Sequence, residues 1–146
     1  MTAPAPRASS PEALRRMKNT RRRDTDLEVV LRRLLFAKGL RFRIDEKVLP
    51  DFNRRADLVF AASRVAVFVD GCFWHYCPIH RTQPRANSAW WLAKLRTNRR
   101  RDLDTNRRLK KAGWSVARVW GHEPAATAAA RIVKTVRARL RRARPR

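Results

Sequence analysis

Residues 70–80 hold the side chains best suited to metal binding or acid–base chemistry. Two thiols and two imidazoles fall within this short stretch, at Cys72, His75, Cys77 and His80. Thiolates and imidazoles are the usual ligands of zinc, and a closed tetrahedral site needs four ligands. Because a third histidine, His122, occurs elsewhere, either it or His75 would supply the fourth ligand. Two buried cysteines with surface histidines are the alternative, since this spacing is not a common zinc motif.

The elements that must position this stretch follow from the hydrophobic periodicity of the chain. Helical and alternating apolar patterns predict helices at about 25–38, 88–111 and 125–140, and strands at 41–44, 56–60, 65–69 and 114–120. The run Val65–Val69 is apolar throughout, which is typical of a central strand buried on both faces. Residues 70–80 therefore follow a buried strand end, where α/β proteins commonly build their sites. The order of elements indicates an α/β sandwich on a small mixed sheet.

Composition limits the class of protein and its partner. The chain has 146 residues, which suits one domain, and its 36 Lys and Arg against 12 Asp and Glu give a net charge of +24. No apolar run reaches the ~18 residues of a membrane span, and no apolar signal segment follows Met1. Two cysteines are too few for a disulfide framework. We therefore expect a cytoplasmic domain in a reducing compartment, without membrane contact, and nucleic acid as the first candidate partner.

The positive charge is concentrated at the two ends of the chain but is not confined to them. Residues 1–23 hold seven basic residues and one acidic residue, residues 131–146 hold eight basic and none acidic, and residues 24–130 keep a surplus of ten positive charges. We expect a disordered tail over 1–13, a single domain over 14–140 that begins with a basic DNA-contacting segment at 14–23, and a basic tail over 141–146. Counterion release predicts binding to a polyanion that weakens steeply with salt.

Motifs spread over most of the chain match one known family in order and spacing. The central motif is Gly-Cys-Phe-Trp-His at residues 71–75, preceded by Asp70. The other matching positions are Met17–Asn19, Arg23–Thr25, Glu28, Arg54–Asp57, Trp90, Trp91, Lys94, Asn98, Arg101, Asp102, Gly113, Trp114, Val119 and Trp120. Over about residues 14–123, this set resembles the very short patch repair (Vsr) family of DNA mismatch endonucleases.

The resemblance implies both a fold and a reaction. The implied fold is a restriction-endonuclease-like α/β sandwich of the PD-(D/E)xK type, with three layers, a small mixed central sheet and a structural zinc site. The implied reaction is magnesium-dependent hydrolysis of one DNA strand beside a T·G mismatch that arises when 5-methylcytosine deaminates. The partner is then double-stranded DNA with that mismatch, in the bacterial cytoplasm at the nucleoid. One asymmetric mismatch needs no symmetric enzyme, so we expect a monomer.

The resemblance assigns the catalytic magnesium to two strands. Asp57 matches the family's metal-binding aspartate, and a carboxylate suits a hard dication that also contacts the scissile phosphate. A salt bridge from Asp57 to Arg54 or Arg55 is the alternative. The second contact precedes the Gly-Cys-Phe-Trp-His motif, where better-known members have Thr-His and this chain has Val69-Asp70. The backbone carbonyl of Val69 would serve there, and Asp70 could add a carboxylate to metal or water.

Three further residues match catalytic or neighbouring positions of the family. His75 matches the catalytic histidine, and a near-neutral imidazole could accept a proton or orient water. Glu28 matches a helix-borne acid near the site, although Thr25 and Glu28 also form a capping-box pattern at a helix start. Asp102 matches an acidic position on the long helix, with pairing to Arg99 or another helix neighbour as the alternative.

The resemblance also assigns the zinc ligands and the DNA contacts. The zinc ligands are Cys72, Cys77, His80 and His122, which leaves His75 for catalysis. The DNA-binding residues are Phe73, Trp74, Trp91, Asn98, Met17 and Asn19. Phe73, Trp74 and Trp91 match aromatic side chains that insert into the base stack, and unstacking costs least at a mismatched pair. We expect Trp114 and Trp120, which flank an apolar strand, to pack in the core instead.

Two other functions remain open from the sequence. One is a related nuclease with a broader or different DNA substrate. The other is a catalytically impaired DNA-binding module, which the net charge and the Val69-Asp70 departure would suit. Asp57 and His75 separate these readings, because a module that only binds DNA needs neither side chain.

Overall fold

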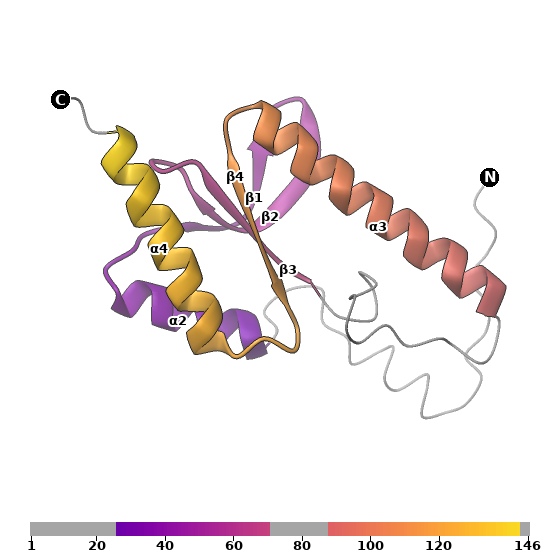
Figure 1. The fold of residues 1–146 in the computed structure, drawn as a ribbon, viewed down its shortest axis with the longest axis horizontal. Coiled ribbons are helices and arrows are strands. Elements are labelled where there is room, and N and C mark those ends of the chain that lie inside the picture. The colour runs from indigo at the N-terminus through magenta and orange to yellow at the C-terminus, as the bar shows by residue number, and fades with distance from the viewer. Residues whose placement is uncertain (1–25, 71–87, 144–146) are drawn as a thin grey trace.

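The computed structural model describes residues 26–70 and 88–143, which form three helices and four strands (Figure 1). In chain order they are α2 (Asp26–Ala37), β1 (Arg43–Leu49), β2 (Phe52–Phe60), β3 (Val65–Asp70), α3 (Ser88–Lys111), β4 (Ser115–Trp120) and α4 (Ala125–Ala143). The predicted order of elements is confirmed. None of the helices in these two ranges is long and apolar enough to cross a membrane.

The four strands form one mixed sheet in the order β1-β2-β3-β4. The β1–β2 and β2–β3 pairs are antiparallel, and β3 and β4 are parallel. A parallel pair needs a long crossover connection, and α3 lies in the chain between these two strands. Parallel pairing also brings the carboxyl ends of β3 and β4 to the same edge, where Asp70 lies opposite Trp120.

The helices α2 and α4 cover one face of the sheet (Figure 1). Their apolar sides pack against inward-facing residues of β2, β3 and β4. The most deeply buried members of this core are Leu31, Leu35, Val65, Val67, Val119, Ala128 and Ile132. Leu31 and Leu35 of α2 are four residues apart, as are Ala128 and Ile132 of α4. This interval places each pair on one face of its helix, as an apolar stripe requires.

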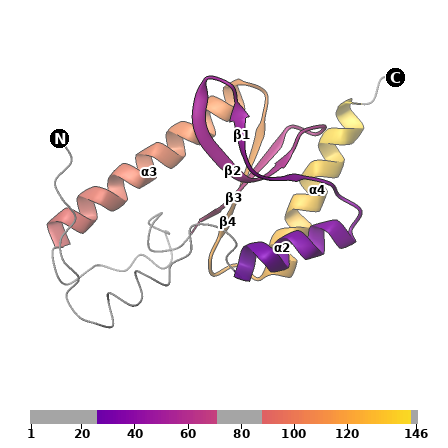
Figure 2. The same ribbon diagram turned by 180° about the vertical axis from the view of Figure 1, so that it is seen from behind.

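The long helix α3 lies against the opposite face, as the view from behind shows (Figure 2). Leu109 of α3 packs with a second group of buried residues, which comprises Ala56, Val59, Ala66 and Phe68. The structure therefore has three layers with the sheet in the middle. Because Val65–Phe68 are buried on alternating faces, the prediction of a central strand covered on both sides is confirmed.

The hairpin of β1 and β2 is longer than its sequence pattern predicts. The chain turns at residues 50–51, but Phe52 already pairs with Leu49. Phe52 is buried beneath the guanidinium groups of Arg54 and Arg108, whose central carbons lie 4.9 and 5.2 Å from its ring centroid. The aliphatic parts of these charged side chains cover apolar surface while their head groups reach solvent. The alternation of apolar and polar residues that predicts a strand is therefore less clear in this hairpin.

Two glycines end helices of the structure, and one of the two tryptophans predicted for the core packs there. Gly39 and Gly113 follow α2 and α3 with φ angles of 84° and 89°, which favour glycine. Trp114 packs, partly buried, against the core beneath α3. The helix α4 continues to Ala143, three residues beyond the predicted end.

Candidate active site

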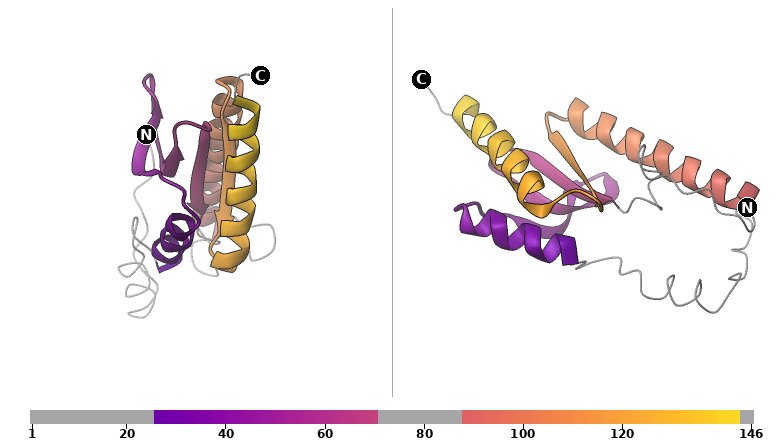
Figure 3. Two further views of the ribbon diagram at one scale, coloured as in Figure 1. Left: turned by 90° about the vertical axis from the view of Figure 1, so that its left-hand side faces the viewer. Right: turned by 60° about the horizontal axis from the view of Figure 1, so that its bottom comes forward.

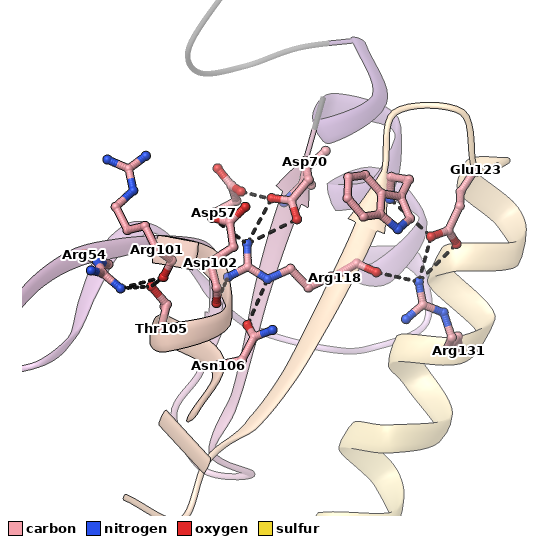
Figure 4. A network of polar contacts seen from close by, with 12 residues as sticks. Arg54, Asp57, Asp70, Arg101, Asp102, Thr105, Asn106, Arg118, Glu123 and Arg131 are labelled. Atoms are coloured by element: carbon pink, nitrogen blue, oxygen red, sulfur yellow. Dashed lines mark hydrogen bonds and ion pairs between the residues drawn. The ribbon is translucent and has the colours of Figure 1, made fainter. Parts of the chain in front are cut away.

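The candidate site begins where β2 and β3 stop pairing. Their register ends at Leu58 opposite Val67, and Asp57 is the residue of β2 just before Leu58. The backbone N–H of Val69 donates to Asp57 Oδ2 at 2.6 Å (Figure 4). This bond fixes one carboxylate oxygen against the backbone of β3, at the strand end that precedes residues 71–80.

The environment of Asp57 raises the pKa of its carboxyl group from 3.8 to about 6. Partial burial is the largest cause, and the hydrogen bond from Val69 opposes it. Three other carboxylates, those of Glu28, Asp70 and Asp45, add smaller repulsive contributions. The fold therefore brings Glu28 from the start of α2 and Asp70 from the end of β3 into the electrostatic surroundings of Asp57.

Arg54 and Arg55 do not pair with Asp57, which removes the alternative role predicted for it. Arg54 donates to the Arg101 carbonyl at 2.7 Å and to Asp104 at 3.2 Å. Arg55 forms an ion pair with Asp45 at 3.1 Å. Both guanidinium groups are thus held on other partners, and the Asp57 carboxylate stays close to other negative charges instead.

Arg118 of β4 organises the acidic side of the site. Its Nη1 lies 3.1 Å from both carboxylate oxygens of Asp70, whose side chain is 4% exposed (Figure 4). The same nitrogen lies 3.6 Å from Asp102, while Nη2 donates to the Asp102 carbonyl at 3.2 Å and Nε donates to Asn106 at 2.9 Å. The guanidinium also lies 4.2 Å from the ring centroid of Phe68. One side chain thereby joins β3, β4 and α3.

The sequence analysis did not single out Arg118, although the sequence contains a pattern that could have. The segment Ser115–Trp120 is an apolar strand interrupted by one arginine. A charged residue inside such a strand needs a buried partner of opposite charge. Asp102, for which a helix neighbour was the alternative partner, lies 3.6 Å from Arg118 of this strand.

A second polar group holds the turn after β4. The backbone N–H of Trp120 donates to Glu123 at 3.1 Å, and Arg131 of α4 donates to Glu123 at 3.0 Å and to the Arg118 carbonyl at 2.9 Å (Figure 4). Within this turn, the N–H of Gly121 donates to the Asp70 carbonyl at 2.8 Å. This bond places the turn that contains the exposed His122 beside the end of β3. In the sequence, Cys72 follows two residues after Asp70, the last residue of β3.

The remaining predicted residues fall into two groups. Within the described part of the chain, Asn98 is buried on α3, and Trp91 is partly buried in an edge-to-face contact with Trp90 at 4.8 Å between ring centroids. Outside it lie Met17, Asn19, Cys72, Phe73, Trp74, His75, Cys77 and His80, together with Thr25 of the capping-box pattern. Among residues 26–70 and 88–143, no three His, Cys, Asp or Glu side chains are arranged to hold a metal.

Comparisons with known proteins define the class. A family model described as DNA mismatch endonuclease Vsr matches residues 11–81. The type II nicking enzyme V.NaeI of Lentzea aerocolonigenes is 45% identical over 124 residues, which cover 84% of this chain and 75% of that protein. The type II nicking enzyme V.XorIIP of Xanthomonas oryzae pv. oryzae is 40% identical over 114 residues, or 76% and 81% of the two chains. The DNA mismatch endonuclease Vsr of Escherichia coli is 38% identical over 100 residues, or 67% and 62%.

These matches, on a three-layer α/β fold with an acidic strand edge, define the class as a DNA endonuclease. The chain belongs to the Vsr family.

The first prediction concerns the cost of keeping Asp57 charged. Because its pKa is raised in the folded protein, Asp57 favours folding below pH 3.8, and this contribution is lost as pH rises toward 6. Asp57→Asn should therefore raise the free energy of unfolding at pH 8 by about 2–3 kcal/mol, with the Asn oxygen still accepting from Val69. The gain should vanish near pH 3.5. Urea unfolding at both pH values measures it, and equal stability at pH 8 would contradict a raised pKa.

The second prediction concerns Arg118. Arg118→Met leaves the Asp70 and Asp102 charges without their shared cation and should lower the free energy of unfolding by about 3 kcal/mol or more. Arg118→Lys should lose less, since one ammonium keeps the charge but not all the bonds. Arg43→Met is the matched control, because the Arg43–Glu46 pair at 3.5 Å is exposed and should contribute under about 1 kcal/mol. Similar losses in Arg118→Met and Arg43→Met would show that the buried network is unimportant.

Proposed function

We propose that the chain nicks one strand of double-stranded DNA beside a T·G mismatch left by deamination of 5-methylcytosine. The observation that carries this proposal is the Asp57 carboxylate, which is held against the backbone of β3 and has a pKa raised by burial and by the charges of Glu28 and Asp70. A DNA-binding module gains nothing from clustered carboxylates that would repel phosphates. Relatives named as a DNA mismatch endonuclease and as nicking enzymes support the strand-nicking reaction.

The residues at this edge fit a magnesium ion. Asp57 uses Oδ2 for the Val69 N–H, so its other oxygen is available, and the mutual repulsion of nearby carboxylates is what a dication would relieve. Asp57 and the backbone carbonyl of Val69 would hold the ion, which supplies polarisation of the scissile phosphate and an acidified water. Both are hard oxygen donors, and hard oxygen donors are the ligands that magnesium prefers.

The chain's own side chains would complete the site. His75 would accept a proton from the attacking water, a role drawn from the sequence alone because this residue lies outside the described part of the chain. Glu28 and Asp102 would contribute negative charge and hydrogen bonding around that water. Asp70 contacts Arg118 with both oxygens, so we assign it to shaping the site.

The proposed zinc site would fasten residues 72–80 to the sheet. Its ligands would be Cys72, Cys77, His80 and His122, and a tetrahedral set of thiolates and imidazoles suits zinc. The hydrogen bond from Gly121 to Asp70 supports this set, because it places the turn with His122 beside the strand end that leads to Cys72. Two extended residues span about 7 Å, which is within reach of shared coordination.

The finer fold assignment and the DNA contacts complete the proposal. Three layers around a mixed sheet support a restriction-endonuclease-like sandwich of the PD-(D/E)xK type. Phe73, Trp74 and Trp91 would insert at the mismatch, and Met17, Asn19 and Asn98 would add contacts to DNA. The basic segment 14–23 would follow the phosphate backbone, and a monomer in the bacterial cytoplasm would suffice for one mismatch.

Two alternatives keep specific support. The name "type II nicking enzyme", carried by several relatives, specifies strand nicking without a mismatch, so a nuclease with a different DNA substrate is the first alternative. The Val69-Asp70 departure favours a catalytically impaired DNA-binding module. Cleavage assays on paired substrates separate both from the proposed reaction.

The third prediction is a mismatch-dependent, magnesium-dependent nick. The purified protein should cut a labelled duplex beside the mismatched T, and it should leave a T·A duplex intact and cut neither in a chelator. Asp57→Ala should lower nicking at least about 100-fold while DNA binding persists, because a metal ligand is lost. Asp51→Ala, which removes an exposed aspartate in the hairpin turn, is the matched control and should cut normally.

The outcomes of this assay distinguish the three functions. Equal cutting of the T·G and T·A duplexes would favour the nuclease of different substrate. Tight binding without cutting in magnesium would favour the impaired module. Full cutting by Asp57→Ala would overturn the assignment of Asp57.

The fourth prediction separates the two roles assigned to histidine. His122→Ala should lower the zinc content below one ion per chain and lower the melting temperature, since a ligand is lost. His75→Ala is the matched substitution and should keep its zinc but lose nicking. Elemental analysis with thermal unfolding measures both. Loss of zinc in His75→Ala but not in His122→Ala would exchange the two assignments.

A further inference from the structure

A basic hollow lies between the end of α2 and residues 130–141 of α4. Its volume is about 380 Å³. The residues that line it are Lys38, Ala130, Val133, Lys134, Arg137 and Arg141. We refer to this set as the α2–α4 hollow. Ala130 and Val133 provide small apolar surface, and the other four residues are cations.

The four cations of the α2–α4 hollow lack acidic neighbours among its lining residues. In the part of the chain that the structure describes, the side chains of Lys38, Lys134 and Arg141 form no ion pair or hydrogen bond, and Arg137 donates only to the Lys38 carbonyl, at 3.3 Å. Lys134, Arg137 and Arg141 are spaced by three and four residues, so they share one face of α4. Like charges on one helix face repel each other unless an anion offsets them.

The α2–α4 hollow lies at the opposite end of the sheet from Asp57 and Asp70. Arg139, which lies between two of its lining residues, donates to the Ser63 carbonyl at 2.6 Å. Ser63 precedes the first residue of β3 by two positions, whereas Asp70 is the last residue of β3, about 20 Å further along. Figure 3 shows α2 and α4 both ending on the side away from the end of β3.

We infer that the α2–α4 hollow binds the phosphate backbone of a DNA segment other than the one held at the catalytic edge. Lys134 and Arg141 are separated by about 10 Å along α4, which corresponds to about three successive phosphates of one strand. Lysine and arginine head groups without protein partners are the usual contacts to phosphate oxygens. This inference goes beyond the nicking reaction, because it gives the enzyme two DNA-binding surfaces. One DNA segment bound in the α2–α4 hollow would hold the enzyme while the candidate active site contacts another segment.

The experiment compares two variants that each lose three positive charges. The test variant is Lys38→Gln/Lys134→Gln/Arg141→Gln, and the control variant is Arg33→Gln/Lys110→Gln/Lys111→Gln. All six side chains are exposed, and in the described part of the chain none of them forms an ion pair or hydrogen bond, so neither variant should unfold. Each protein is bound to an immobilised duplex, and capture of a second, fluorescent duplex is measured over a range of salt concentrations.

The wild-type and control proteins should capture the second duplex. The amount that the test variant captures should be lower by about tenfold or more. In a plot of the logarithm of the binding constant for the second duplex against the logarithm of salt concentration, the slope for the test variant should be shallower by about two to three. Nicking of a short duplex that covers only the mismatch should stay unchanged, so loss of nicking in all proteins would count against the proposed function alone.

Three results would overturn the inference. The first is that wild-type protein captures no second duplex. The second is equal capture by the test and control variants, which would show that net charge alone matters. The third is that the test variant loses binding to phosphatidylserine vesicles but keeps second-duplex capture, which would assign the surface to an anionic membrane.

Discussion

The contact of Arg118 with Asp70 is the interaction on which the candidate active site depends. A buried carboxylate is costly without a compensating cation, and the charges of Glu28, Asp70 and Asp45 already raise the pKa of the Asp57 carboxyl group. Arg118 serves this role because its planar guanidinium offers five donors in fixed directions. From β4 it reaches Asp70 on β3 and both Asp102 and Asn106 on α3. The parallel strand pair and the helix over it are thereby held in one arrangement.

The molecule combines an acidic edge with a strongly basic exterior. The net charge of +24 attracts phosphates over a long range, but carboxylates at the edge repel a phosphate at contact distance. The two demands are compatible where a dication stands between carboxylate and phosphate, because it attracts both. The raised pKa of Asp57 expresses the same conflict, since the fold keeps a carboxylate where its charge is poorly solvated. Stability is given up at this position, and the magnesium ion that we propose there would relieve the conflict.

The fold was largely predictable because its elements differ in pattern. The apolar run of β3 and the stripes on α2 and α4 depend on local spacing, which the sequence displays directly. The β1–β2 hairpin was underestimated because Arg54 and Arg108 cover Phe52 with their stems, and such packing joins residues far apart in the chain. In the site, Asp57 and Glu28 came from the family pattern. Arg118 did not, because its partners Asp70 and Asp102 lie 48 and 16 positions away and only the sheet topology brings them together.

The Val69-Asp70 departure can be explained by how each residue is used. Val69 contributes its backbone, whose N–H binds Asp57, so its side chain is free to be apolar. Asp70 contributes a carboxylate that is 4% exposed and lies 3.1 Å from the guanidinium of Arg118 on the neighbouring strand. Conversely, Arg118 without Asp70 would keep its hydrogen bonds to the Asp102 carbonyl and Asn106, but its nearest described carboxylate contact would be the longer one to Asp102. The acid at position 70 and the cation at position 118 therefore form one structural unit. Replacing only one of the two should lower the free energy of unfolding, because the other then loses part of its compensation.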